Sequence, residues 1–543
     1  MILSIISMKT LYYNGKIYVN KNNFAKAFVV DNKKFANIFF DKKDYVIKDY
    51  ENTVDLKGKT VIPGFIDNHN HFLMASRNHN KFNFDNIKSE NDLINELKLY
   101  LQLHFNSNIL YLEGLKLSNL NNLNRITLDK VSVDIPIFIF WSDRHSVLLN
   151  TKALKSIKIF HKQLICNDGI VELDSTGLPN GIIRENACNM VRKFLEQQGF
   201  KNDVKKMEEM QRKILSFGIH TVATCDITDT SFNSNTAIYQ EFEPKRKINI
   251  VHQCGLFKLE KIDSFIKKIN KNPITATNRQ IKIFLDGSIG SKTAALSNKY
   301  IQNDTYCDDD KMNNITDFKA FGIMNFDYEK LMYTVSKINE NNIQVISHCI
   351  GDRSAYLCTK VYSDIDSENK LRNGIIHCQI TSNKLIDLMK HANVYATVQP
   401  CFLEDDLNIL DKYVPQNLLK ESYAFKTMYD KGINLSFSTD APICHYNPFE
   451  NIYYAIANKQ LNKPFLEWNQ KQNFDINDAI ECYTYNAAKF INKENEIGRI
   501  QKDYFANFIV LSKDIFNLKD KKEILDVKVE KNYINGVEML KDL

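Results

Sequence analysis

The stretch Val61-Ile-Pro-Gly-Phe-Ile-Asp-Asn-His-Asn-His71 decides how the rest of the chain is interpreted. It is an apolar run, interrupted by Pro63-Gly64, that ends in two histidines one residue apart. Side chains alternate faces along a strand, so His69 and His71 are expected to point the same way. Two imidazoles on one face supply half of a metal site. For an isolated His-x-His pair, two unrelated polar residues in a loop would be the commoner arrangement, so the interpretation depends on residues downstream.

Eight apolar runs follow one another along the chain. They cover residues 61–67, 221–226, 248–255, 281–286, 343–348, 374–377, 394–399 and 434–440. From the second run onward, most intervals hold segments with helical periodicity, such as residues 383–391. Alternating strands and helices over this length predict a (β/α)8 TIM barrel. Nearly continuous apolar runs fit this fold, because the parallel strands are buried on both faces.

Both ends of the chain differ from the middle. Short strand-like segments fill residues 10–62, where Asn14-Gly15 predicts a hairpin turn, and strand-like segments return after residue 506. We therefore expect a small β-sandwich domain that is built from both termini, residues 1–60 and 494–543.

The barrel is expected to span residues 61–493, with one large insertion. The interval after the first apolar run is much longer than the others and contains its own strand-like stretch, Ile135-Pro-Ile-Phe-Ile-Phe-Trp141. Residues 78–203 are therefore predicted to form a cap subdomain inserted after the first barrel strand. The cap is expected over the barrel mouth, where βα loops emerge.

The overall composition excludes several classes of protein. A net charge of +6 over 543 residues, without a basic block, gives no reason to expect a nucleic-acid partner. The 11 scattered cysteines include no Cys-x-x-Cys pair, which favours free thiols in a reducing compartment. The first residues lack the features of a signal peptide, and no apolar run is long enough for a membrane span. These features predict a cytoplasmic protein, with Met1 or Met8 as its start.

The fourth run contains a charged residue in an apolar context, Lys282. Burial lowers the pKa of a lysine, and a neutral amine can add carbon dioxide to form an anionic carbamate that bridges two cations. The alternative is a lysine whose ammonium reaches the solvent at the barrel rim. Asp286 lies on the same face of the strand, nearer the mouth, and the small residues Gly287 and Ser288 after it would allow a ligand to approach closely. We expect these three residues to bind substrate.

Three further runs end in residues that bind metals in other proteins. His348 ends the fifth run, His377 the sixth and Asp440 the eighth. Taken singly, a strand-end histidine is more often a hydrogen-bonded core residue, and a strand-end aspartate more often forms a turn. Active sites of such barrels lie at the carboxyl ends of the strands, so the whole set is expected to converge there.

These motifs resemble the metal-dependent amidohydrolase superfamily, and within it the YtcJ-like branch that includes N-substituted formamide deformylases. The resemblance covers nearly the whole chain. The matching segments are residues 63–71, Lys282-Ile-Phe-Leu-Asp-Gly-Ser-Ile-Gly-Ser-Lys-Thr-Ala294, His348-Cys-Ile-Gly-Asp352, His377 and Ser438-Thr-Asp-Ala-Pro442. In the predicted cap, His145 with Asn150-Thr-Lys-Ala-Leu154, and Gly177-Leu-Pro-Asn-Gly181 with Glu185, are similar to features of the branch. The chain departs from the pattern at residues 502–507, outside the expected site.

The resemblance implies a role for each of these residues. His69 and His71 would hold one metal with Asp440 beside it, His348 and His377 would hold a second, and carboxylated Lys282 would bridge the two. Asp440 would also move protons in catalysis, and His145 would reach the substrate from the insertion and assist catalysis.

The resemblance and the residues together predict a hydrolase of a non-peptide carbon–nitrogen bond, such as an amide, an N-formyl group or a cyclic amide, that acts through metal-activated water. The expected cofactor is a divalent metal, with zinc preferred over iron or manganese and one or two ions per chain. The expected partner is a small-molecule substrate, and a homodimer is left open. Two alternatives remain at this stage: a lyase or isomerase on the same scaffold, and an inert ligand-binding barrel.

Overall fold

The computed structural model describes residues 9–78, 82, 84, 87–104, 109–115, 123–141, 146–160, 169–185, 187–276, 280–301, 320–461 and 468–539. The chain divides into two compact units, one of residues Met1–Ala75 with Glu208–Leu543 and one of residues Ser76–Met207. Helices α1 (Phe72–Asn78) and α5 (Cys188–Ser216) contain the points where the chain passes from one unit to the other. None of the helices in the described ranges is both long and apolar enough to cross a bilayer.

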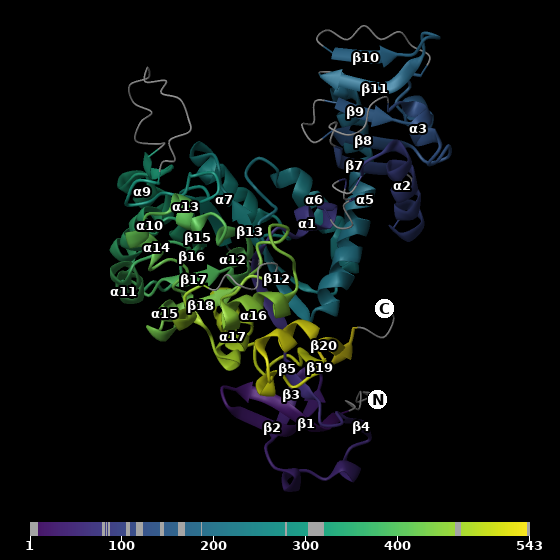
Figure 1. Ribbon diagram of the computed structural model, residues 1–543. Helices are drawn as coiled ribbons and strands as arrows, with labels where there is room; N and C mark the ends of the chain where they lie inside the picture. Colours follow the sequence, from purple (N-terminus) through teal and green to yellow (C-terminus); the bar gives the residue numbers. More distant parts are fainter. Residues whose placement is uncertain are drawn as a thin grey trace. The chain divides into compact units, whose positions relative to one another are not determined.

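The larger unit contains the expected barrel, an eight-stranded parallel sheet in the order β18-β17-β16-β15-β14-β13-β12-β6 (Figure 1). Its strands are β6 (Phe65–Asn70), β12 (Ile219–Thr224), β13 (Asn249–Gly255), β14 (Gln280–Phe284), β15 (Gln344–Cys349), β16 (Gly374–His377), β17 (Tyr395–Val398) and β18 (Asn434–Phe437). The ring closes beyond the last strand, where Asp440 N donates to His69 O at 2.8 Å and His71 N donates to Ala441 O at 2.8 Å. The predicted barrel is confirmed.

Helices connect and cover these strands (Figure 1). They are α6 (Phe232–Phe242), α7 (Ile262–Lys271), α9 (Tyr328–Asn339), α10 (Asp352–Ile365), α11 (Asn383–His391), α12 (Leu403–Asp406), α13 (Leu410–Tyr413), α14 (Gln416–Leu419), α15 (Phe425–Asp430), α16 (Pro448–Ala457), α17 (Ile476–Tyr483) and α18 (Tyr485–Phe490). Helix α7 illustrates why they pack on the sheet, since Ile262, Phe265, Ile266 and Ile269 recur at helical spacing and are all buried.

The first apolar run is split between two sheets, which corrects the expected boundary. Residues 60–63 form β5 (Thr60–Pro63) of the terminal sheet, and the barrel strand β6 starts at Phe65. The switch falls at Gly64, where an added Cβ would lie 1.8 Å from Nδ1 of the buried His220. Only glycine allows this close approach, and the preceding Pro63 has no N–H to donate to either sheet.

The terminal β domain is built from both ends of the chain, as expected. Its sheet has the order β21-β20-β19-β5-β1-β2-β3, with β4 beside β1 (Figure 1). The remaining strands are β1 (Thr10–Asn20), β2 (Asn23–Asp31), β3 (Lys34–Phe39), β4 (Asn52–Asp55), β19 (Phe508–Leu511), β20 (Val529–Ile534) and β21 (Val537–Glu538). The C-terminal β19 pairs antiparallel with the N-terminal β5, so each end of the chain completes the sheet of the other.

The hairpin predicted at Asn14-Gly15 is wrong, because β1 continues through it. The pairing with β2 shifts register between Tyr13 and Ile17, which marks a bulge in β1. Before the bulge, β1 pairs with β4, and after it β1 pairs with β5. Asn14 has a left-handed backbone, at φ 57°. It therefore lies where β1 exchanges one neighbouring strand for another, and the chain does not reverse there.

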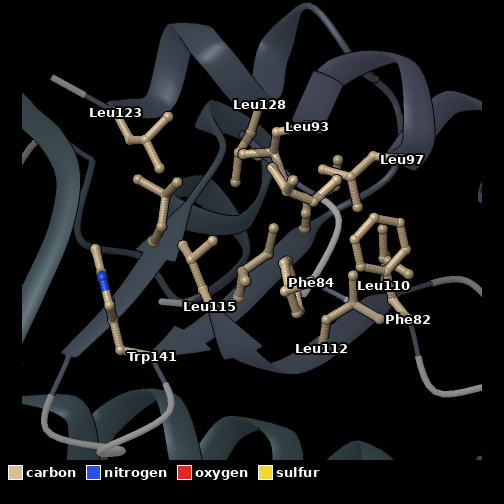
Figure 2. Packing of buried hydrophobic residues seen from close by; sticks show 14 of the residues in the cluster. Phe82, Phe84, Leu93, Leu97, Leu110, Leu112, Leu115, Leu123, Leu128 and Trp141 are labelled. Atoms are coloured by element: carbon tan, nitrogen blue, oxygen red, sulfur yellow. The ribbon is translucent and has the colours of Figure 1, made fainter. Parts of the chain in front are cut away.

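The smaller unit is the insertion after the first barrel strand. Its sheet has the order β10-β11-β9-β8-β7. Its elements are α2 (Glu90–His104), β7 (Leu110–Leu115), α3 (Arg125–Asp129), β8 (Ile137–Trp141), β9 (Ser146–Leu149), α4 (Thr151–Ser156), β10 (Gly169–Leu173) and β11 (Pro179–Glu185). Leu93 and Leu97 of α2 pack with Leu112 of β7 and Trp141 of β8 in a buried cluster of its own (Figure 2).

Candidate metal centre

Two histidines and one carboxylate converge where the barrel closes. Nε2 of His69 and Nε2 of His71 each lie 3.3 Å from Oδ1 of Asp440. His69 is fully buried, Asp440 is 7% exposed, and Oδ1 of Asp440 has no hydrogen-bond donor in the described part of the chain. A buried carboxylate oxygen is rarely left without a partner.

The hydrogen bonds of Nδ1 determine whether Nε2 of each histidine can accept. In all four histidines of the predicted site, Nδ1 faces an oxygen that carries no proton to donate. The pairs are His69 with Gln253 Oε1 at 2.6 Å, His71 with Cys225 O at 3.0 Å, His348 with Asp286 Oδ1 at 2.9 Å, and His377 with Gln399 Oε1 at 2.8 Å. Each imidazole must therefore donate from Nδ1, which leaves the lone pair of Nε2 free for a metal.

His348, His377 and Lys282 lie close to His69 and Asp440. Ligand atoms of His69, His377 and Asp440 lie within 4.8 Å of one another. The rings of His348 and His377 are 4.5 Å apart, and Nζ of Lys282, a residue 2% exposed, lies 2.8 Å from Nε2 of His69. The structure thus brings together all six residues that were predicted as metal ligands. The resemblance assigned His377 to a second ion, whereas the geometry allows one cation to contact it together with His69 and Asp440.

The backbone of two of these residues is unusual. His377 has a φ of 87° and Asp440 a φ of 54°, in the left-handed region that non-glycine residues seldom adopt. Strained conformations of this kind cluster at functional sites, where the surrounding structure holds them. For Asp440 that support includes Asp67 on β6, whose carboxylate accepts from Thr439 N at 3.0 Å and from Thr439 Oγ1 at 2.6 Å.

The electrostatics favour the protonation states that bind cations. Burial lowers the pKa of His69 to about 4, and the nearby Lys282 acts in the same direction. Burial likewise lowers the pKa of His377 and of Lys282. Burial raises the pKa of Asp440, whereas hydrogen bonds donated by His69 and His71 would hold that pKa well below its usual range, and a cation bound at their Nε2 atoms would act in the same direction. Neutral imidazoles next to an ionised carboxylate fit a divalent metal.

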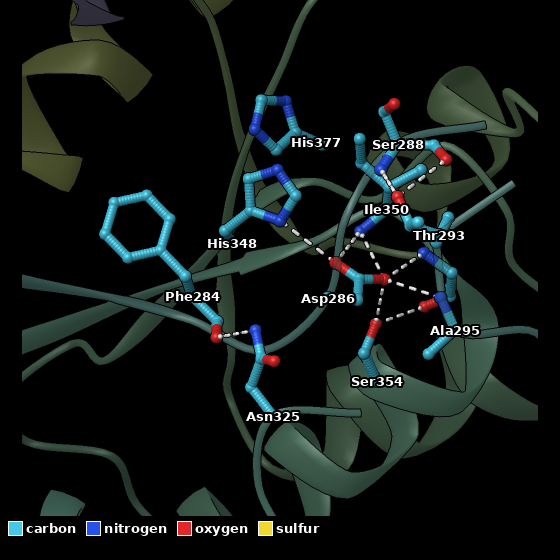
Figure 3. Close-up of polar contacts among 12 residues, drawn as sticks. Phe284, Asp286, Ser288, Thr293, Ala295, Asn325, His348, Ile350, Ser354 and His377 are labelled. Carbon is cyan, nitrogen blue, oxygen red and sulfur yellow. Dashed lines mark hydrogen bonds and ion pairs between the residues drawn. The ribbon is translucent and has the colours of Figure 1, made fainter. Parts of the chain in front are cut away.

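Asp286 does not offer its carboxylate to a substrate. In addition to the His348 imidazole, its oxygens accept from Ala295 N at 3.1 Å, Gly351 N at 2.8 Å and Ser354 Oγ at 2.7 Å, and its side chain is fully buried (Figure 3). A carboxylate with this many donors has no oxygen left for a ligand. Asp286 therefore orients His348 and anchors the loop that follows β14, which corrects its expected role in substrate binding.

The small residues after Asp286 also have structural partners. A Cβ on Gly287 would lie 2.1 Å from Oγ1 of Thr293, so this glycine is required by the packing of its own loop. Ser288 is exposed, and its hydroxyl lies 2.9 Å from that of Ser291. The expectation that Gly287 and Ser288 bind substrate remains a prediction. His145 lies outside the described residues.

Two site residues were not anticipated from the sequence. Gln253 and Gln399 hold His69 and His377, and both lie in predicted apolar runs. Each lies near the carboxyl end of its run, but other polar residues in the same runs, such as Asn249, His252 and Thr397, give no reason to single it out from the sequence.

Comparison with known proteins agrees with this architecture. Residues 52–539 match a family model described as the amidohydrolase family. YtcJ of Bacillus subtilis (strain 168), which is described as an amidohydrolase, is 24% identical over 554 residues, covering 97% of this chain and 99% of that protein. The N-substituted formamide deformylase of Arthrobacter pascens is 22% identical over 520 residues, covering 89% of each chain.

A solved structure supports the fold separately. The crystal structure of an uncharacterized metal-dependent hydrolase from Pyrococcus horikoshii OT3 superposes with a TM-score of 0.69 at 24% identity, covering 94% of this chain and 99% of that one. The fold and the gathered histidines are those of a barrel hydrolase with a candidate metal site. Because the family model matches nearly its whole length, the chain belongs to the amidohydrolase family.

Proposed function

We propose that the protein hydrolyses a non-peptide carbon–nitrogen bond, such as an amide, an N-formyl group or a cyclic amide. The observation that carries the proposal is the convergence of two Nε2 lone pairs on the orphaned Oδ1 of Asp440, at 3.3 Å each. Nζ of Lys282 can donate to Nε2 of His69, but Oδ1 of Asp440 has no donor in the described part of the chain, so a cation between these atoms would stabilise the site. A divalent cation bound there would lower the pKa of water and polarise the carbonyl under attack.

Asp440 is the proposed proton carrier. In its ionised form the carboxylate, 3.3 Å from the Nε2 atoms of His69 and His71, would accept a proton from the attacking water and return it to the leaving nitrogen. His69 and His71 lie at and just beyond the end of β6, which lies beside the end of β18 where the ring closes, and His145 of the insertion is proposed to assist at the carbonyl oxygen. Lys282, carrying a carboxylate, is proposed to bridge two ions between these histidines and the pair His348 and His377.

We expect the purified protein to contain one or two divalent transition-metal ions per chain, with zinc the preferred ion. Neutral nitrogen ligands combined with a carboxylate suit zinc. Elemental analysis of protein prepared without chelators checks this. Trace metal only, with no binding when zinc, manganese or iron is added, would contradict the expectation.

A hydrolysis screen of the metal-loaded protein tests the reaction. Formamides, acyl amines, hydantoins and lactams cover the proposed bond types, and release of the amine is the measured quantity. Turnover that requires metal supports the proposal. A metal-loaded protein that is inert on the whole panel, or that transforms a substrate without consuming water, would favour the ligand-binding or lyase alternative instead.

His145→Ala is expected to weaken turnover on the best substrate from that screen by about 10-fold or more, while the metal content stays unchanged. The proposal is supported by the position of His145 in the insertion that follows the first metal-site strand. His391→Ala provides the control, because His391 is exposed on α11. Equal rates in the His145 variant and the parent would remove His145 from the site.

A further inference from the structure

The histidines of the metal centre are oriented by side chains from other strands of the barrel. Gln253 on β13 reaches the ring of His69 on β6, and Gln399, directly after β17, reaches the ring of His377 at the end of β16. Both glutamines are buried, at 0% and 1% exposure, so neither amide can form hydrogen bonds with bulk water. Each amide therefore depends on its protein partners at both ends.

For Gln253, the second end of the amide defines which atom faces the histidine. Nε2 of Gln253 donates to Asn68 O at 2.9 Å, and a backbone carbonyl can only accept. The amide oxygen must then face His69. Because this oxygen can only accept, Nδ1 of His69 has to carry the proton and donate it. Nε2 of Gln399 donates to Ser438 Oγ at 2.7 Å and its Oε1 lies 2.8 Å from Nδ1 of His377, although the Ser438 hydroxyl, unlike a carbonyl, could also donate.

We propose that Gln253 and Gln399 are positioning residues of the metal centre, which hold His69 and His377 in the Nδ1–H tautomer and so present Nε2 to the cation. The proposal rests on the metal centre proposed above. An amide oxygen suits this task at a buried histidine, because a neutral acceptor fixes the proton on Nδ1 without favouring the positively charged imidazole. At His348, which is less buried, the acceptor is the carboxylate of Asp286.

The effect to measure is the affinity for zinc, determined by competition with a chromophoric chelator. Gln399→Leu keeps the size of the side chain and removes the acceptor, and it should weaken zinc binding about 10- to 100-fold, the usual result of removing a group that orients a ligand histidine. Gln253→Leu should have an effect of similar size through His69. Gln399→Glu keeps an acceptor for Nδ1, and the hydroxyl of Ser438 can turn to donate to it, so this variant should bind zinc within a few-fold of the parent.

Gln280→Leu is the matched control. Gln280 is also a buried glutamine of the barrel, but Nε2 donates to Gln344 Oε1 at 2.7 Å, and among the described residues the side chain has no hydrogen bond with a histidine. Its loss should lower the melting temperature and leave zinc affinity unchanged. A merely structural role for Gln399 predicts that Gln399→Leu and Gln280→Leu behave alike, and that Gln399→Glu is no better than Gln399→Leu.

Substitution of cobalt for zinc adds a spectroscopic readout of the ligand geometry. The visible absorption bands of bound cobalt should change in Gln399→Leu and be restored in Gln399→Glu. Unchanged zinc affinity and cobalt bands in both leucine variants would overturn the proposal, as would a parent protein that binds neither metal. Because none of these measurements involves a substrate, a protein that binds zinc as described but hydrolyses no amide would refute the proposed reaction alone.

Discussion

Asp440→Asn is expected to lower turnover by about two to four orders of magnitude while the protein keeps most of its metal. This is the usual scale for the loss of a general acid–base group and corresponds to about 3–5 kcal/mol of transition-state stabilisation. Asparagine has nearly the same shape and retains one oxygen near His69 and His71, so the site stays assembled. It cannot accept a proton from water, because an amide is not basic.

Three roles of Asp440 can be separated by this variant. A residue that only shapes the turn would tolerate asparagine, which adopts the left-handed backbone at φ 54° as readily as aspartate. A residue that only binds metal would lose affinity, and excess zinc would restore the rate. The rate and metal content of Asp352→Asn provide a control, since Asp352 is also a buried aspartate but accepts from Ser297 N at 2.9 Å. Near-normal turnover of Asp440→Asn would exclude Asp440 from the proton transfer.

The barrel could be predicted from the sequence because its strands are buried on both faces. Nearly every residue of strands such as β15 and β16 is therefore buried, and a charged or imidazole side chain within them stands out. The boundary at Gly64 could not be predicted, since Val61 and Ile62 are fully buried in the terminal sheet just as Phe65 is in the barrel. An apolar run predicts that its residues are buried, but it does not predict in which of two sheets they lie.

The candidate ligands could be singled out because, Lys282 within β14 apart, they lie at or just beyond the carboxyl ends of barrel strands, where the active sites of such barrels lie. Their supporting partners could not, because these depend on register and rotamers between segments far apart in the chain. Gln253 and His69 are separated by 184 positions. Asp286 was singled out for substrate binding by its place near the barrel mouth, yet the backbone N–H groups of Ile350 and Gly351 already occupy its oxygens.

Lys282→Ala is expected to reduce metal content to at most one ion per chain and to lower turnover at least about 100-fold. Nζ of Lys282 lies 2.8 Å from the metal-facing nitrogen of His69, and burial lowers the pKa of the amine. A neutral amine is the form that adds carbon dioxide, with loss of one proton, to give a carbamate. This anion would place two oxygens among the histidines, where an ammonium would repel a cation. Removal of the side chain would remove both oxygens of such a carbamate, and a second ion would lose its bridge.

Chemical rescue distinguishes this role from a purely structural one. Short carboxylic acids added to Lys282→Ala should restore part of the metal content and part of the rate, because they can supply a carboxylate to the vacated space. Lys258→Ala, which changes an exposed lysine after β13, should differ little from the parent in either quantity. Density for an unmodified lysine in a crystal structure with both metal positions filled would rule out the carbamate. The charge between the two ions would then have to come from another group, and of the predicted ligands only Asp440 carries a negative charge of its own.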